Sequence, residues 1–200
     1  MASSGTTKSW IARTELLAIA LAALAGCASQ PPSFPESAAQ GLPDNANVLY
    51  GDNYLFSVAT PANWDVDTEV GKAHGIDAVF FPAGTPWQDS VRMYPQIWQK
   101  GQDLDLAKVI AQDLEQYVQS HPGLQAVDAT PIALGESGPA TVRHFSSSNP
   151  DSHEAVAYID RDRTVVVLVL HADDRAAFDQ FLPTFQSWVQ SYRPLEHLAR

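Results

Sequence analysis

One segment near the C-terminal end of the 200-residue chain is apolar on both faces of the strand that it predicts. Residues 165–170 read VVVLVL, a short run of branched side chains that is typical of a strand. An antiparallel strand with one face in water alternates apolar and polar side chains, and this run has no polar position. The run therefore predicts a sheet that is covered on both faces, with helices as the expected cover.

The first helix that can provide this cover lies within residues 103–123. Asp103 or Asp105 can cap its first turn, and His121 stands at its C-terminal end, where a cation interacts favourably with the helix dipole. The side expected to face the sheet consists of Ala107, Ile110, Ala111, Leu114, Val118 and His121.

A second helix is expected over residues 173–192, which carry an apolar stripe at helical spacing. Pro183 lies inside this stripe and has no N–H to donate, so we expect it to kink the helix or to begin a second short one. The stripe consists of Phe178, Phe181, Leu182, Phe185, Trp188, Val189 and Tyr192.

Further strands are expected on both sides of the first helix. Before it lie residues 54–59, 64–70, 76–84 and 90–98; Pro95 predicts an edge or a break in the last of these. Asp65, Asp67 and Glu69 would share one face of the strand 64–70, and we interpret them as a solvated face rather than a cation site. After the helix lie residues 124–134, 139–148, 153–160 and 163–172. The fold class is therefore α+β, an antiparallel central sheet with helices on both faces.

This pattern resembles the PsbP-like and DcrB-like α/β/α sandwich domains over most of residues 54–194. The matching segments are YLFSVATPANWDVDTE, AVFFPAG, EAVAYIDRDRTVVVLVLHA and FLPTFQSWVQSYRP, which are core and turn signals without a catalytic residue. Domains of that kind are membrane-associated accessory proteins, and several are lipoproteins. The resemblance therefore implies a function in binding or assembly rather than in chemistry.

The N-terminal residues have the features of an export signal. Lys8 and Arg13 precede ten apolar residues, 16–25, which are too few for a membrane span of roughly 20 residues. Residues 24–27, LAGC, resemble a bacterial lipobox, so residues 1–26 are expected to be a lipoprotein signal peptide and Cys27 the lipidated N-terminus. The alternative is an ordinary signal peptide with an incidental cysteine.

Cys27 is the single cysteine, so a lipidated mature chain has no thiol for catalysis and no disulfide. Its palmitate and other acyl chains would hold it at a membrane. Ala28 matches the sorting pattern of outer-membrane lipoproteins, so we expect an envelope protein on the outer membrane that faces the periplasm. Residues 27–47 are expected to form the anchor and a flexible stalk, and residues 48–200 a single domain that starts near Val48.

The charge of the chain excludes some partners. Its 23 acidic and 12 basic residues give a net charge of −11, which repels polyanions. Binding to nucleic acid or to bare anionic headgroups requires clustered lysine and arginine, so neither is an expected partner.

Motifs of known enzyme classes are missing from the sequence, which has no GxSxG, phosphate-binding loop, HExxH or CxxC pattern. GESGP, residues 135–139, is interpreted as a turn between strands. His171, Asp173 and Asp174 are metal-ligand types at close spacing. Aspartates before a helix are usually its caps, and we interpret Asp173 and Asp174 as caps.

The turn after residue 146 offers a second candidate metal site. If residues 147–150 form a four-residue hairpin loop, His144 lies opposite His153 and Arg143 opposite Glu154. Two imidazoles with Asp151 as a third ligand could bind zinc or copper. We interpret the histidines as a surface pair without a metal ion, and no cofactor is expected.

Two functions remain open at this point. The first is a non-catalytic envelope lipoprotein that acts as a binding or assembly accessory factor and docks on an envelope protein. The alternative is a periplasmic carrier of a metal ion or a small ligand. An enzyme is not expected, because no catalytic set of residues is visible in the sequence.

Overall fold

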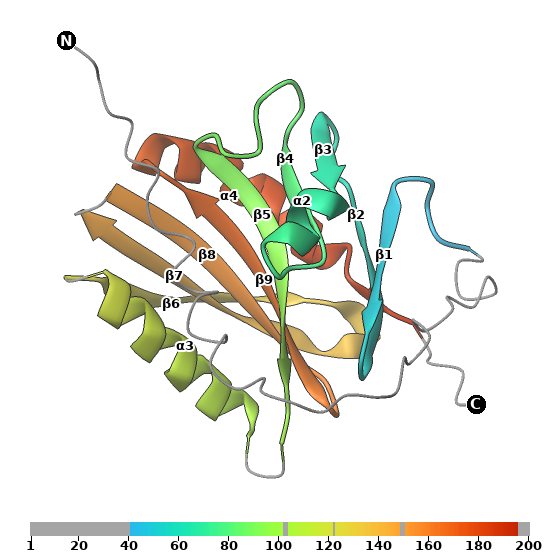
Figure 1. The fold of residues 1–200 in the computed structure, drawn as a ribbon. Coiled ribbons are helices and arrows are strands. Elements are labelled where there is room, and N and C mark those ends of the chain that lie inside the picture. The colour runs from blue at the N-terminus through green and yellow to red at the C-terminus, as the bar shows by residue number, and fades with distance from the viewer. Residues whose placement is uncertain (1–40, 102–103, 122, 149–150, 196–200) are drawn as a thin grey trace, which may run out of the picture.

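The computed structural model describes residues 41–195 apart from 102–103, 122 and 149–150, so Cys27 and most of the expected stalk lie outside the described residues. The strands form two antiparallel sheets (Figure 1), one ordered β1-β2-β10 and one ordered β3-β4-β5-β9-β8-β7-β6. The strands are β1 (Ala46–Gly51), β2 (Tyr54–Ala59), β3 (Trp64–Asp67), β4 (Val79–Pro82), β5 (Val91–Gln99), β6 (Gln125–Ala133), β7 (Pro139–Ser148), β8 (Asp151–Asp160), β9 (Thr164–Ala172) and β10 (Arg193–Pro194). The helices are α2 (Thr68–Ala73), α3 (Leu106–Ser120) and α4 (Arg175–Gln190).

Strand β9 is the buried interior strand that the apolar run predicts. It pairs with β5 on one side and with β8 on the other, and each of its residues is buried. The valines at 165, 167 and 169 join one core cluster, whereas Val166, Leu168 and Leu170 join the other. Consecutive residues therefore enter opposite cores, and both faces of the sheet are covered.

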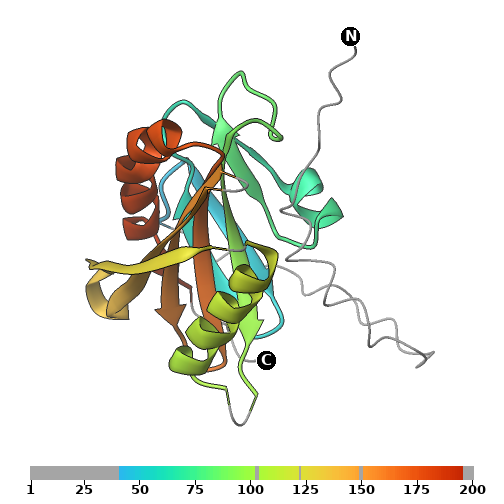
Figure 2. The ribbon, with the colours of Figure 1, turned by 90° about the vertical axis from the view of Figure 1, so that its left-hand side faces the viewer.

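The helices provide this cover, so the fold has three layers with the large sheet in the middle. Figure 2 shows α4 on one face of the large sheet and α2 and α3 on the other. On the α4 face, Trp188 packs against Phe80 of β4 at 5.0 Å between ring centroids, and Tyr192 packs against Phe56 of β2 at 5.3 Å. The small sheet thus shares its core with α4. This architecture confirms the α+β class with an antiparallel sheet and helices on both faces.

Several local predictions are also confirmed. The segment 54–59 is strand β2, and the four segments after the first helix are β6 to β9. GESGP forms a short 3₁₀ turn between β6 and β7, Gly135–Ser137. Pro95 lies in β5 opposite Leu168 of β9, beyond the point at which β5 pairs with β4 through Met93 and Phe80. That part of β5 has a free edge on its other side, where a missing backbone donor is tolerated.

The prediction of one acidic strand over residues 64–70 is wrong. Strand β3 ends at Asp67, and α2 begins at the next residue. Asp67 caps the helix, since its Oδ1 accepts the backbone N–H of Val70 at 2.8 Å, and Glu69 pairs with Lys72 at 3.1 Å. Asp65 and Asp67 remain on one face of β3, whereas Glu69 lies in α2, so the three carboxylates do not share a strand face. The strand expected over 76–84 is also shorter, because only Val79–Pro82 is extended and paired.

The buried side of α3 differs from the expected one. Val109, Asp113 and Tyr117 are buried, while Val118 is 49% exposed and Ala107 and Ala111 are exposed. Asp113 is tolerated in the core because its Oδ2 accepts the hydroxyl of Tyr158 at 2.5 Å. A polar residue thus occupies the centre of the buried side, which a count of apolar residues cannot show.

The two ends of α3 are closed differently from one another. Asp105 caps the start, as one of the two predicted candidates, by accepting the backbone N–H of Lys108 at 2.9 Å. His121 at the other end is buried, as expected for the side that faces the sheet. Its ring is buried and stacks on Tyr117 at 4.3 Å, and its Nδ1 lies 3.0 Å from Ser120 Oγ.

One boundary also differs from expectation. Helix α4 runs through Pro183 as one element, because its buried side chains, Phe178, Phe185, Trp188 and Val189, hold both halves against the sheet. The first strand, β1, begins at Ala46. Asn47 Nδ2 donates to Thr60 Oγ1 at 2.6 Å, so polar contacts extend β1 beyond its apolar part.

Candidate functional site

The predicted candidates His171 and Asp173 lie in one cluster at the end of β9, in which His171 and Glu154 are buried and Asp173 is exposed. His171 Nδ1 is 3.0 Å from Glu154 Oε1 of β8, and its Nε2 is 2.8 Å from Asp173 Oδ1. The hydrogen bond from His171 lowers the pKa of the Asp173 carboxyl. Arg92 of β5 lies opposite His171 in the ladder. Both imidazole nitrogens therefore contact carboxylates of the protein itself.

The interpretation of these aspartates as helix caps is correct for one of them. Asp174 caps α4 by accepting the backbone N–H of Ala177 at 2.8 Å. Asp173 instead turns toward His171, so the two neighbouring carboxylates have different functions. With both of its nitrogens engaged, His171 joins β8, β9 and the segment before α4, which is a structural function.

The expected pairing of His144 with His153 is wrong. The β7–β8 ladder continues to Ser148 and Asp151, which shifts the register by two, so His144 lies opposite Ala155 and His153 opposite Ser146. The cause is a shorter loop than the four residues expected. Arg143 correspondingly lies opposite a valine rather than Glu154, and it pairs with Asp128 of β6 at 2.6 Å.

Both histidines nevertheless lie on one face, where they pack against Phe178 of α4 at 5.4 and 5.9 Å between ring centroids. Burial lowers the pKa of His144, and Arg175 lowers it further. His153 Nε2 lies 3.0 Å from Asp151 Oδ1. Among the described residues, no group of three or more histidine, cysteine, aspartate and glutamate side chains is placed to hold a metal ion.

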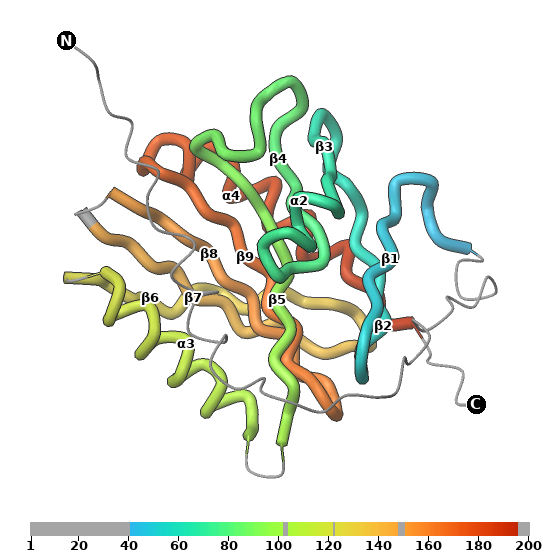
Figure 3. Tube along the Cα trace, viewed as in Figure 1, coloured from blue at the N-terminus to red at the C-terminus, as the bar shows by residue number. Residues whose placement is uncertain are grey.

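A different region brings distant parts of the chain together. The tip of the β1–β2 hairpin contacts the end of β5 and the turn between β8 and β9, as Figure 3 shows. Asn53 Nδ2 donates to Gln99 Oε1 at 3.1 Å, Gln99 Nε2 donates to the Asp52 carbonyl at 2.6 Å, and Arg163 Nη1 donates to Asn53 Oδ1 at 3.2 Å. We call this region the hairpin junction, because it joins the two sheets.

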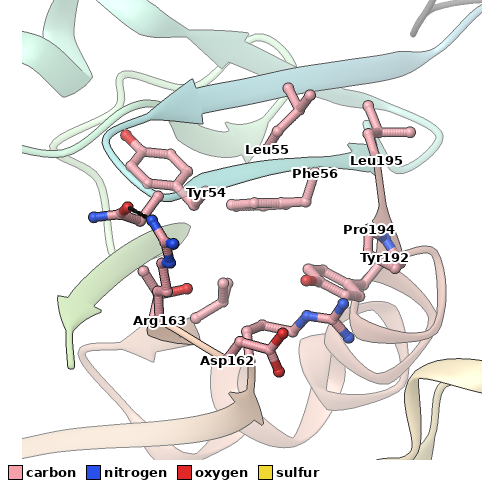
Figure 4. A pocket seen from close by; sticks show the side chains of 12 residues that line it. Tyr54, Leu55, Phe56, Asp162, Arg163, Tyr192, Pro194 and Leu195 are labelled. Carbon is pink, nitrogen blue, oxygen red and sulfur yellow. Dashed lines mark hydrogen bonds between the residues drawn. The ribbon is translucent and has the colours of Figure 1, made fainter. Parts of the chain in front are cut away.

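A pocket of about 510 Å³, which we call the arginine pocket, opens at the hairpin junction (Figure 4). Its walls come from the start of β2, from the turn at residues 161–164 and from residues 192–195 after α4. Figure 4 shows the hydroxyl of Tyr192 directed into the pocket, with Phe56 across from it and Arg163 at the rim beside Tyr54. The pocket thus combines aromatic walls with guanidinium groups.

The polar groups of the arginine pocket have few partners within the protein. Tyr192 is 1% exposed, and its hydroxyl has no hydrogen-bond partner in the described part of the chain. Burial raises the pKa of Tyr192, and the nearby charge of Arg161 partly offsets this effect. The Arg161 guanidinium forms no ion pair with a described carboxylate. The pocket can therefore offer hydrogen-bond donors and positive charge to a ligand.

A second pocket, of about 640 Å³, lies on the other side of Tyr54. Its lining includes Asp77, Asp113, Trp98 and three glutamines, at positions 96, 99 and 116. The Tyr54 hydroxyl donates to Asp77 Oδ1 at 3.0 Å, and burial raises the pKa of both groups. Tyr54 therefore divides a pocket with arginines from a pocket with carboxylates and amides.

Sequence reasoning did not find the hairpin junction. The two arginines of the turn DRDR were available as a signal, since basic residues are scarce in this chain. Tyr192 was assigned to the apolar stripe of the last helix. Its ring is buried, as that stripe requires, but it lies two residues beyond the end of α4, and the stripe gave no information about its hydroxyl. The contact between Asn53 and Arg163 joins residues that are 110 positions apart, so it could not be read from spacing.

No family model matches the chain, and no curated protein matches it. Among solved structures, the cyanobacterial PsbP (CyanoP) of Synechocystis is 14% identical, with a TM-score of 0.51 over 78% of this chain and 95% of that one. LpqN of Mycobacterium tuberculosis, described as involved in cell envelope biogenesis, is 17% identical, with a TM-score of 0.47 over 76% and 91%. The Ran-binding protein Mog1p of Saccharomyces cerevisiae is 10% identical, with a TM-score of 0.47 over 75% and 95%. The chain has a PsbP-like fold, and this likeness shows the fold alone.

Proposed function

We propose that this chain is a non-catalytic accessory protein of the cell envelope, which acts by binding at the hairpin junction. The observation that supports a binding function is the contrast between the two groups of polar side chains. Both nitrogens of His171 contact carboxylates of the protein, whereas Arg161 and the hydroxyl of Tyr192 face a pocket without such partners in the described residues. A general base needs a nitrogen that can reach the substrate, and a binding site needs donors that are still available.

The proposed location follows from the N-terminal sequence. Lipidation at Cys27 after removal of residues 1–26 would anchor the chain, and Ala28 supports the outer membrane, facing the periplasm. None of the described helices is long and apolar enough to cross a membrane. A stalk over residues 28–47 would have a root-mean-square reach of roughly 25 Å, so the domain would stay close to its membrane. This confinement raises its effective concentration toward other envelope proteins, so that a weak docking contact would suffice.

A small-ligand carrier is the second candidate function. The two pockets at the hairpin junction have volumes of about 510 and 640 Å³. Pockets that bind small molecules typically have volumes of roughly 300–1,000 Å³ and combine apolar walls with a few polar groups. The pockets therefore favour a small organic molecule over a metal ion as the cargo of such a carrier.

Site-specific photo-crosslinking in the envelope of living cells tests the proposal. A crosslinking residue at the exposed position Asp162, on the rim of the arginine pocket, should capture a partner or ligand. The matched control is the exposed position Gln125 at the start of β6, which lines neither pocket and should capture little. Equal capture at both positions, or capture at position 125 alone, would contradict binding at the hairpin junction.

Substitution of Asp173, the exposed carboxylate next to His171, tests the absence of catalysis. The change Asp173→Asn keeps the shape of the side chain and removes its charge next to His171. We expect cells that carry this variant to keep the function of the protein when the variant is folded and abundant. Loss of function in a folded variant would indicate a chemical site and would overturn the accessory function.

A further inference from the structure

We infer that the arginine pocket binds an anionic amphiphile, a molecule with an oxyanion headgroup and an apolar body. This inference rests on the proposed function, binding at the hairpin junction, and names the class of ligand. The headgroup would lie against the guanidinium of Arg161 and the hydroxyl of Tyr192, and the apolar body against the aromatic walls.

Arg161 is the first reason for an anionic headgroup. The chain has 23 acidic and 12 basic residues, and the basic side chains of Lys72, Lys100, Arg143 and Arg175 each pair with a carboxylate. Arg161 is half-buried and has no such pair in the described part of the chain. A guanidinium presents a planar set of donors that matches the two oxygens of a carboxylate or phosphate. A ligand can supply the anion that this arginine lacks.

The backbone of the turn holds the two arginines in place. Lys100 Nζ donates to the Arg161 carbonyl at 2.6 Å, and the Lys100 backbone N–H donates to the Arg163 carbonyl at 2.8 Å. Arg161 N–H donates in turn to the Thr164 carbonyl at 2.9 Å. Arg163 donates to the amide oxygen of Asn53 and so keeps its full charge at the rim. The backbone of both arginines and the guanidinium of Arg163 are therefore held in place before a ligand arrives, and the guanidinium of Arg161 stays available to it.

Tyr192 is the second reason. Its side chain is 1% exposed, and its hydroxyl points into the pocket without a hydrogen-bond partner among the described residues (Figure 4). The hydroxyl keeps some contact with solvent in the pocket, and a ligand oxygen would take the place of water as its hydrogen-bond acceptor. Because burial raises the pKa of Tyr192, the phenol keeps its proton at neutral pH and can donate it in a hydrogen bond to an anion.

The walls of the pocket supply the contact for an apolar body. Phe56 and Val166 are each 1% exposed, and Phe56 packs on Tyr192 at 5.3 Å and near Tyr54 at 6.1 Å between ring centroids. Leu195 is half-buried at the edge. These side chains form an apolar wall next to the positive groups, which is the arrangement that an amphiphile with an acidic end requires.

Asp162 is the one carboxylate in the lining of this pocket. It lies on the exposed rim, where water and salt screen its charge, whereas Arg161 and Tyr192 lie deeper. Its charge opposes an anionic ligand and would favour a cationic one. The substitution Asp162→Asn therefore distinguishes the sign of the ligand, since it should tighten the binding of an anion and weaken that of a cation.

The test measures the binding of simple probes to the full mature chain, made without lipid as Cys27→Ser, by isothermal titration calorimetry. Octanoate and octyl phosphate, used below their micelle concentrations, are the anionic probes, and octyltrimethylammonium and octanol are the cationic and neutral ones. We expect both anions to bind at least tenfold more tightly than the other two. The stronger of the two anions identifies a carboxylate or a phosphate as the preferred headgroup.

Variants locate the binding in the arginine pocket. Arg161→Gln should weaken octanoate binding at least tenfold and Tyr192→Phe several-fold, whereas Asp162→Asn should strengthen it. Arg143→Gln, which removes an arginine on β7 outside the pocket, is the control and should change nothing. Thermal unfolding of each variant checks the fold, and Arg161 is half-exposed in a turn, so its replacement should leave the melting temperature unchanged.

Two results would overturn the inference: octyltrimethylammonium binding as tightly as octanoate, or octanoate binding unchanged in folded Arg161→Gln. Either result leaves the crosslinking from position 162 free to succeed, in which case the hairpin junction binds a partner of different chemistry. If crosslinking fails but octanoate binds tightly, the inferred class of ligand is supported and the proposed docking on a protein partner is contradicted.

Discussion

The burial of β9 on both faces can be tested with two neighbouring substitutions, Val167→Ala and Leu168→Ala. The two side chains are 0% exposed and belong to different core clusters, one next to α3 and one next to α4. In a sheet with one wet face, only one of the two substitutions would be costly. With both faces covered, both should destabilise the fold.

The expected magnitudes follow from the atoms removed. Val167→Ala removes two buried methyl groups, worth about 0.8 kcal/mol each in transfer, and the residual cavity raises the loss to about 2–3 kcal/mol. Leu168 lies between Pro95 of β5 and Ala157 of β8. These small, fixed neighbours cannot fill the space, so Leu168→Ala should cost about 3–4 kcal/mol, within the range for buried leucines.

Urea unfolding, followed by tryptophan fluorescence and circular dichroism, measures the free energy of unfolding of each variant. The matched control is Val127→Ala on β6, where the side chain is 63% exposed and the loss should be about 0.5 kcal/mol or less. A loss no larger than this control for either β9 variant would refute the reasoning, because it would place that side chain in water.

Four further outcomes are expected. Tyr158→Phe should lower the free energy of unfolding by about 1–3 kcal/mol in urea titrations, because it leaves the buried carboxylate of Asp113 without its hydroxyl donor. Burial lowers the pKa of His144, so the unfolded state binds more protons than the folded state in acid. The free energy of unfolding should therefore fall as the pH drops below about 6.5, and His144→Gln should flatten this dependence in unfolding curves recorded across pH. Cys27→Ser should block lipoprotein processing and release the protein from membranes on fractionation, and unchanged processing would contradict the lipobox. Deletion of residues 28–40 behind an intact anchor, which leaves β1 and its contacts whole, should impair function in cells more than any single polar substitution outside the arginine pocket.

The sequence alone determined the features that depend on neighbouring residues. Side-chain oxygens of Asp105 and Asp174 cap α3 and α4 three residues ahead of the N–H groups that they accept, so the caps could be placed from spacing. The apolar run of β9 predicted a sheet with two covered faces, because an apolar side chain indicates burial whatever its distant partners are.

Tertiary structure decided the features that depend on distant partners. Asp113 lies on the buried side of α3, where the hydroxyl of Tyr158, 45 residues away, donates to it, and no periodicity of α3 contains that information. The register of His144 depended on the length of one loop, and a shift of two residues removed the predicted pair. The arginine pocket joins β2, the turn at Arg161 and the ring of Tyr192. Long-range contacts of this kind form when the two sheets pack against each other, so only the folded chain shows which donors have partners.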